Sequence, residues 1–135
     1  MTKKVLLTGV SGFLGHHCAT ELIKSGYFVK GTVRDLRRKN EVLNGIKKEV
    51  DPNEKIEFIK LDLLKDDGWE DAVKGCEYIL HVASPSSVDE PSHEDEYIKP
   101  TVEGTRRVLK YAKKAKIKRF VLTSSIVSLM GVVYD

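Results

Sequence analysis

The sequence has little of what marks secreted, membrane or metal-binding proteins. Among its 135 residues are only two cysteines, Cys18 and Cys76, and they show neither a C-x-x-C spacing nor a disulfide framework. We interpret both as small buried side chains. No apolar run approaches the ~20 residues needed to span a bilayer, and the Met-Thr-Lys-Lys start leads directly into a predicted strand rather than a signal peptide. These absences favour a soluble, cytoplasmic protein.

The sequence also lacks an excess of either charge. Its 23 basic and 20 acidic residues give a formal net charge of +3, which is too balanced to indicate a nucleic-acid or membrane partner without a focused basic patch. Basic clusters occur at residues 34–39 and 110–119. The second cluster falls on a predicted helix with an apolar opposite face, so we interpret it as a solvated helix surface. We therefore expect no nucleic acid and no membrane partner.

The most specific pattern present is an apolar strand, residues 5–8, followed by Gly9, Gly12 and Gly15 and then by a helical pattern. In this spacing Gly9 permits a tight turn, Gly12 lets the backbone approach a pyrophosphate, and Gly15 lets the helix pack close to the strand. The unpaired N–H groups at the start of the helix, near Phe13, then face the anion. A glycine triplet alone also fits an ordinary strand–turn–helix connection, so the interpretation depends on the rest of the chain.

The rest of the chain alternates strand and helix patterns, with no repeat and no obvious linker. Apolar runs predict strands at residues 5–8, 28–33, 56–61, 78–83 and 120–124. Helical spacing predicts helices up to residue 25, over 36–50, around 69–74 and within 91–116, with Pro100 expected to start or kink the last one. Residues 1–135 are thus predicted to form one α/β domain, a doubly wound parallel sheet or Rossmann fold, with its ligand beyond the carboxyl ends of the strands.

The residues that follow the second and third strands indicate which dinucleotide binds. An acid after strand two bonds the 2′-hydroxyl of NAD, whereas an arginine accommodates the 2′-phosphate of NADP. Arg34 stands there and Lys39 lies just beyond, which favours NADP because a guanidinium binds phosphate bidentately. Asp35 leaves NAD open, and Arg34 also fits an ordinary surface charge. After strand three, Asp62 either bonds the adenine amino group or caps the next segment, and Leu63 contacts the ring.

These motifs together resemble the extended short-chain dehydrogenases/reductases of the NAD-dependent epimerase/dehydratase superfamily. Within them the chain is most similar to the branch of dihydroflavonol reductases, cinnamoyl-CoA reductases and related aldehyde or ketone reductases. The resemblance covers essentially the whole chain and rests on residues 8–15, 32–35, 62–63, 75–76, 81–85, 102–105 and 123–125. Epimerase-type relatives carry asparagines before the Val-x-Gly-Thr motif, where this chain has Pro100-Thr101. That departure disfavours a nucleotide-sugar epimerase or dehydratase.

The resemblance implies a reductase mechanism. In the family, the end of strand four, here residues 82–84, passes beside the nicotinamide, and Ser125 matches the catalytic serine that holds the substrate carbonyl oxygen. A hydride moves to the carbonyl carbon, and a tyrosine, whose pKa is lowered by a lysine four residues later, supplies the proton. No tyrosine of this sequence is followed by a lysine at that spacing. We therefore interpret the chain as the inactive amino-terminal portion of a longer NADP-dependent reductase, without the later strands and the substrate region.

The expected site follows from these motifs. The expected cofactor-binding residues are Thr8, Gly9, Ser11, Gly12, Phe13, Leu14, Gly15, Arg34, Lys39, Asp62, Leu63, Val82, Ala83, Ser84 and Thr123. Ser125 is the expected catalytic residue. No metal site is expected, because the adjacent His16 and His17 point in different directions on a helix. His81 and Trp69 are interpreted as core residues. The expected partner is a small-molecule carbonyl substrate, and the parent protein is expected to be a monomer or homodimer. The alternative to a reductase is a non-catalytic module that binds or senses NADP.

Overall fold

Five parallel strands form one sheet in the order β3-β2-β1-β4-β5 in the computed structural model, which describes residues 2–84, 93 and 95–130. The strands are β1 (Lys4–Thr8), β2 (Phe28–Val33), β3 (Ile56–Lys60), β4 (Tyr78–His81) and β5 (Arg119–Leu122). The helices are α1 (Phe13–Lys24), the 3₁₀ helix η1 (Leu36–Arg38), α2 (Lys39–Ile46), α3 (Trp69–Val73), α4 (Asp95–Lys114) and the 3₁₀ helix η2 (Ile126–Ser128). The predicted doubly wound parallel sheet is confirmed.

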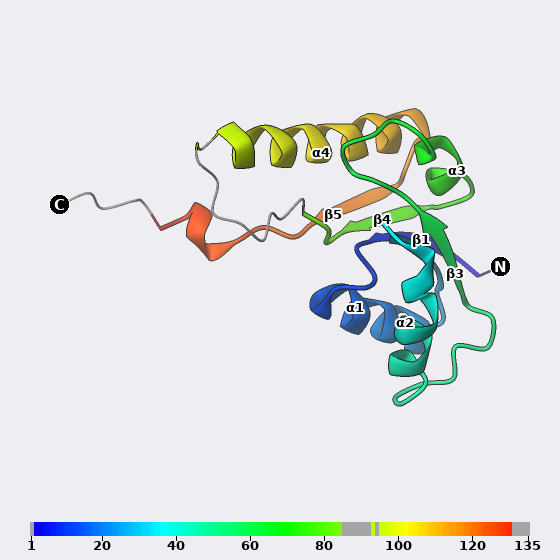
Figure 1. Ribbon diagram of the computed structural model, residues 1–135. Coiled ribbons are helices and arrows are strands. Elements are labelled where there is room, and N and C mark those ends of the chain that lie inside the picture. The colour runs from blue at the N-terminus through cyan, green and yellow to red at the C-terminus, as the bar shows by residue number, and fades with distance from the viewer. Residues whose placement is uncertain (1, 85–92, 94, 131–135) are drawn as a thin grey trace.

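Helices cover both faces of the sheet, with α1 and α2 on one side and α3 and α4 on the other (Figure 1). Successive residues of β1 feed the two layers because side chains alternate along a strand. Leu6 belongs to the core that contains Val108 of α4, and Leu7 to the core that contains Ala19 of α1. Burial on both faces explains why the central strand β1 contains the continuous apolar run of residues 5–7.

The order of the strands reverses direction at β1, since β2 pairs with one of its edges and β4 with the other. In open α/β sheets this switch point opens a crevice at the carboxyl ends of the two central strands. The glycine turn between β1 and α1 lies at that end of the sheet (Figure 1). The topology therefore places the glycine motif where a ligand can enter.

Local signals account for several element ends. Helix α1 ends at Lys24, where Gly26 adopts a left-handed conformation with φ of 84°, as predicted for a glycine cap. The segment predicted as one helix over residues 36–50 is instead η1 followed by α2. Its beginning is fixed by Asp35, whose side chain accepts a hydrogen bond from the backbone N–H of Arg37.

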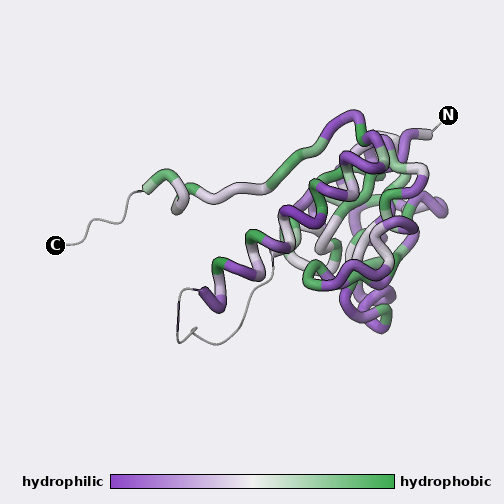
Figure 2. Tube along the Cα trace, turned by 90° about the horizontal axis from the view of Figure 1, so that it is seen from above, coloured by the Kyte–Doolittle hydropathy of each residue, from purple (hydrophilic) through white to green (hydrophobic). Residues whose placement is uncertain are grey.

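Helix α4 runs from Asp95 through Pro100, so of the two expectations for this proline, that it starts the helix is wrong and that it kinks the helix stays a prediction. A proline inside a helix costs roughly 3 kcal/mol, and here it falls near the amino-terminal end of a 20-residue helix. Burial of Val108, Tyr111 and Ala112 further along anchors the helix to the sheet and offsets that cost. Hydrophobic and hydrophilic residues alternate along the turns of α4 (Figure 2), as expected of a half-solvated helix.

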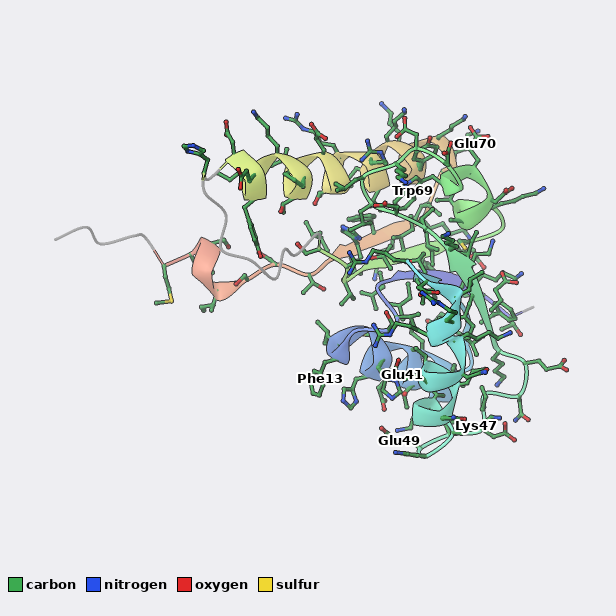
Figure 3. The ribbon with its side chains drawn as sticks, viewed as in Figure 1. Phe13, Glu41, Lys47, Glu49, Trp69 and Glu70 are labelled. Carbon is green, nitrogen blue, oxygen red and sulfur yellow. The ribbon has the colours of Figure 1, made fainter. Side chains whose placement is uncertain are left out.

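Trp69 anchors α3 in the core, as predicted. Its ring is buried and stacks against Tyr111 of α4, with centroids 5.9 Å apart. The indole N–H donates to the backbone carbonyl of Lys65 at 3.0 Å, so burial leaves no unpaired donor. Figure 3 shows Trp69 between α4 and the sheet.

Candidate functional site

A cavity of about 500 Å³ opens at the carboxyl ends of β1, β2, β3 and β4. It brings together most of the residues predicted from the sequence to bind a cofactor: Gly9, Ser11, Gly12, Phe13, Leu14, Gly15, Arg34, Asp62, Leu63, Val82, Ala83 and Ser84. Thr8, Lys39 and Thr123 do not line it. These residues come from segments that are far apart in the sequence, from the end of β1 to the end of β4. The pairing of the strands in the sheet brings them to one edge.

The glycine turn has the geometry that the spacing predicts. Gly9 has a φ of 73°, and its N–H donates to Thr32 Oγ1 of β2 at 3.1 Å. A β-carbon on Gly15 would overlap the carbonyl of Gly9, so the helix approaches the turn closely. Gly12 is exposed and lines the cavity, while its own N–H donates to the carbonyl of Gly9 at 3.1 Å. Within the turn, the N–H groups of Gly9, Val10 and Gly12 donate to other groups of the protein. The backbone N–H groups that face the cavity are therefore those of the first residues of α1, which have no partner within the helix and can bind phosphates.

Phe13 begins α1 and is 84% exposed; Figure 3 shows it at the start of that helix. Its ring contacts the imidazole of His17 edge-on, with centroids 4.7 Å apart. The rings of His16 and His17 lie 5.6 Å apart at an interplanar angle of 85°. Within residues 2–84, 93 and 95–130, no group of histidine, cysteine or acidic side chains could hold a metal ion.

Arg34 follows β2 and lines the cavity with an exposed side chain. Its cationic neighbours are engaged elsewhere: Arg37 pairs with Asp35, and Arg38 pairs with Glu41. No hydrogen bond or ion pair engages the Arg34 guanidinium among the residues that the structure describes. Arg34 is thus the arginine at this strand end that is available to a ligand.

Asp35, the acid that left NAD open, is held by its own neighbour. Arg37 Nε donates to both carboxylate oxygens, at 3.1 and 2.8 Å, and these bonds together with the backbone N–H of Arg37 lower the pKa of Asp35 to about 2. A carboxylate saturated in this way is a poor acceptor for a ribose hydroxyl. Lys39 also points away from the cavity, since its ammonium lies 5.9 Å from the centroid of the Phe58 ring.

Of the two roles that the sequence left open for Asp62, the structure shows the cap of the segment after β3. The other role, a hydrogen bond to the adenine amino group, stays a prediction. Asp62 Oδ1 accepts the backbone N–H of Leu64 at 2.9 Å, so it caps the turn after β3. The residue also lines the cavity beside Leu63. The lining contains further residues that were not among the expected cofactor-binding residues: Thr32, Asp35, Arg38, Leu61 and Leu64. Proximity to the motif residues was the available signal for these, because each lies within four positions of Arg34 or Asp62.

Thr8 is completely buried beneath the cavity rather than in its lining. Its Oγ1 accepts hydrogen bonds from the N–H groups of Val82 and Ala83, both at 3.1 Å. Strand β4 consequently ends at His81, earlier than predicted, because the next two amides bond a side chain instead of a strand. Thr8 therefore ties the segment after β4 to the end of β1.

Thr123 and Ser125 follow β5 and are exposed outside the cavity lining. The backbone N–H of Thr123 donates to the carbonyl of His81 at 3.1 Å, which keeps this segment beside the end of β4. The Ser125 carbonyl accepts from the hydroxyl of Ser128 at 2.6 Å. The segment that contains Thr123 and Ser125 therefore lies beside the end of β4, which leads into residues 82–84, the ones expected to meet the nicotinamide.

The doubly wound sheet, with a glycine turn at its switch point, defines a Rossmann-type protein. The chain belongs to the NAD dependent epimerase/dehydratase family, whose sequence model matches residues 5–134. The resemblance predicted from the motifs is confirmed.

No helix among the described residues is both long and apolar enough to cross a membrane.

Plant reductases are among the most similar relatives. The dihydroflavonol 4-reductase of Arabidopsis thaliana is 40% identical over 127 residues, which cover 90% of this chain and 32% of that protein. The tetraketide alpha-pyrone reductase 1 of Arabidopsis thaliana is 37% identical over 123 residues, covering 90% of this chain and 37% of that protein. The chain therefore spans about a third of the length of these curated relatives.

Solved structures of reductases are also similar to this chain. Vestitone reductase from alfalfa has a TM-score of 0.71 at 34% identity, over 90% of this chain and 36% of that one. The yeast methylglyoxal/isovaleraldehyde reductase complexed with NADPH has a TM-score of 0.76 at 28% identity, over 90% of this chain and 37% of that one.

Proposed function

We propose that this chain is the cofactor-binding portion of an NADP-dependent oxidoreductase that reduces an aldehyde or ketone to an alcohol. The observation that carries the proposal is the cavity at the switch point, with the glycine turn on one side and the unpaired Arg34 on another. The reductases named above, one of them solved with NADPH, support the same reaction class.

The residues present fit this cofactor. The N–H groups at the start of α1, beside Gly12, would hold the pyrophosphate, and Arg34 the 2′-phosphate. Asp62 has one carboxylate oxygen occupied by Leu64 and a second available for the adenine amino group. Residues 82–84 would border the nicotinamide, which when bound supplies the hydride.

Catalysis would need more than these residues. We propose that Ser125, just after β5, hydrogen-bonds the substrate carbonyl oxygen, as its match to the family motif implies. The proton donor is a tyrosine with a lysine four residues later in such enzymes, and Tyr27, Tyr78, Tyr97 and Tyr111 are followed at that spacing by Gly31, Val82, Thr101 and Ala115. We therefore expect the 135-residue chain to bind NADPH without turning over.

Two further proposals concern the setting of the protein. Cys18 and Cys76 are both free thiols, which fits a reducing compartment, and we propose a cytoplasmic location. The partner would be a small carbonyl compound, with the parent protein a monomer or homodimer and neither nucleic acid nor membrane involved.

A second candidate function is a non-catalytic module that binds or senses NADP. The observation that supports it is the cavity itself, whose lining serves binding and does not include Ser125. The parent gene separates the two: a Tyr-x-x-x-Lys within some tens of residues after Asp135 supports the enzyme, and its absence removes that function.

The direct test is to titrate the chain with NADPH and with NADH while following thermal unfolding. A ligand at one hundred times its Kd stabilises a protein by about 2.7 kcal/mol, so selective binding gives a clear rise for NADPH alone. An equal response to both cofactors would contradict the choice of NADP, and no response to either would contradict the proposed function. Oxidation of NADPH by the chain with any aldehyde would contradict its expected inactivity.

A further inference from the structure

Three polar groups converge on one buried hydroxyl beneath the cavity. Thr8 Oγ1 lies 2.7 Å from His81 Nδ1 and 3.1 Å from the backbone nitrogens of both Val82 and Ala83. The Thr8 and His81 side chains are 0% and 3% exposed. Thr8 and His81 are paired neighbours at the ends of β1 and β4, so the sheet register fixes this arrangement.

The chemistry of a hydroxyl determines where its proton goes. A threonine hydroxyl has one hydrogen to donate and two lone pairs to accept with. The amides of Val82 and Ala83 can only donate, so they use both lone pairs of Thr8 Oγ1. The hydroxyl hydrogen is then directed to His81 Nδ1, which has to be unprotonated to accept it. A neutral imidazole with an acceptor at Nδ1 carries its proton on Nε2.

The surroundings of His81 favour this neutral form. Its paired neighbours on β1 and β5 are the uncharged Thr8 and Leu122, and the Phe120 ring centroid lies 6.1 Å from that of the imidazole. Burial alone lowers the pKa of His81, to about 4. No charged side chain contributes to this shift.

The hydroxyl in turn positions part of the cavity. Val82 and Ala83 line the cavity, and both amides follow the last residue of β4. Ala83 lies directly against the glycine turn, because a β-carbon on Gly9 would come within 2.9 Å of its side chain. The spacing between the turn after β1 and the turn after β4 therefore depends on which way the Thr8 hydroxyl points.

We propose that His81 is a positioning residue of the cofactor cavity: as the Nε2-protonated imidazole it takes the hydroxyl proton of Thr8, leaving both lone pairs of that oxygen to hold Val82 and Ala83 against the glycine turn. The effect on cofactor binding rests on the proposed function. The hydrogen-bond arrangement itself does not, so the two can be tested separately.

The first experiment needs no cofactor. Nitrogen NMR of the histidine side chains in the full 135-residue chain at neutral pH distinguishes the two tautomers and the imidazolium. His81 is expected to show a proton on Nε2 and an unprotonated Nδ1. A proton on Nδ1, in either the other tautomer or the cation, would overturn the proposal whatever the chain binds.

The second experiment uses matched variants. His81→Leu removes the acceptor, whereas His81→Asn offers an amide oxygen near the position of Nδ1. Thr8→Val and Thr8→Ser make the same comparison at the hydroxyl. Thr20→Val is the control, since Thr20 is also buried but bonds the carbonyl of His16 within α1.

The readouts are amide hydrogen exchange at Val82 and Ala83 and the Kd for NADPH. His81→Leu and Thr8→Val are expected to speed exchange and raise the Kd about tenfold or more, the equivalent of one or two hydrogen bonds. His81→Asn and Thr8→Ser should recover most of the slow amide exchange and most of the affinity for NADPH. Thr20→Val should alter neither readout. Unchanged exchange and Kd in His81→Leu would overturn the proposal. If His81→Leu does not fold, the Thr8 pair decides in the same way. A wild-type chain that binds no NADPH contradicts the proposed function, and the exchange data then decide this inference alone.

Discussion

Gly9 and Ala83 meet so closely that a β-carbon on Gly9 would lie 2.9 Å from that of Ala83. The turn after β1 and the segment after β4 are thus in direct contact where both line the cavity. Because Gly9 also has a φ of 73°, the position excludes other residues both by space and by backbone conformation. The two halves of the proposed cofactor site are therefore fitted to one another.

Substitution of Gly9 tests this contact. Gly9→Ala is expected to raise the Kd for NADPH at least about tenfold and to destabilise the chain by roughly 1–3 kcal/mol, because strain and overlap add. Gly26→Ala is the matched control, since Gly26 has a φ of 84° but no atom within 4 Å of an added β-carbon. It should cost stability and leave the Kd unchanged. Isothermal titration and denaturant unfolding measure both; equal Kd effects in the two variants would contradict the contact's role.

The choice of cofactor is expected to depend on Arg34. Arg34→Ala should weaken NADPH by about tenfold or more while changing NADH little, because only NADPH carries the phosphate that the guanidinium would bind. Arg106→Ala removes the same charge from α4 and should leave the ratio of the two Kd values unaltered. An equal loss for both cofactors in Arg34→Ala would show that the side chain does not select NADP.

The pairing of Asp35 with Arg37 predicts a specific titration. The folded-state pKa of Asp35 is lowered to about 2, mainly by the side-chain and backbone hydrogen bonds of Arg37, from the ordinary value of 3.8. A lowered carboxyl pKa means that the pair's stabilisation is present above pH 3.8 and is lost as the pH falls through about 2. Carbon NMR of the carboxyl group should show this midpoint, and Arg37→Ala should move it back towards 3.8. A wild-type midpoint near 3.8 would contradict the pairing.

His81 should make the free energy of unfolding of the chain depend on pH between about 4 and 6.5. Its folded-state pKa is about 4, against 6.5 for an unperturbed histidine. Between these values the unfolded chain binds a proton that the folded chain does not, so the free energy of unfolding falls as the pH drops from about 6.5 to 4. At roughly 1.4 kcal/mol per unit, the loss reaches about 3 kcal/mol. Denaturant unfolding across this range should show the slope, and His81→Asn should remove most of it; an undiminished slope would place its origin elsewhere.

The sequence predicted the sheet well because its signals are local. A strand buried on both faces gives a continuous apolar run, as in residues 5–7 of β1, and the glycine spacing encodes the turn directly. Arg34 was predictable for a related reason: a residue that follows a strand lies at the strand's carboxyl end whatever the helices do.

The remaining features depend on partners distant in the chain. Lys39 was expected at the cofactor but lies over Phe58, a contact between α2 and β3 that no local pattern encodes. Thr8 was expected to touch the cofactor, yet it is buried and bonds the segment after β4. In both cases the residue type was informative, whereas the direction of the side chain depended on tertiary packing.

The stack of Trp69 on Tyr111 provides a test of what holds α3 and α4 against the sheet. Trp69→Ala is expected to destabilise the chain by about 3–5 kcal/mol, because it leaves a large cavity in a fully buried position. Trp69→Phe keeps an aromatic ring but loses the hydrogen bond to the Lys65 carbonyl, so it should cost less. Denaturant unfolding measures both, with Tyr97→Ala as control, since Tyr97 is exposed on α4. Because Trp69 lies outside the cavity lining, the folded fraction of Trp69→Phe should bind NADPH as the wild type does; weaker binding would couple this core to the site.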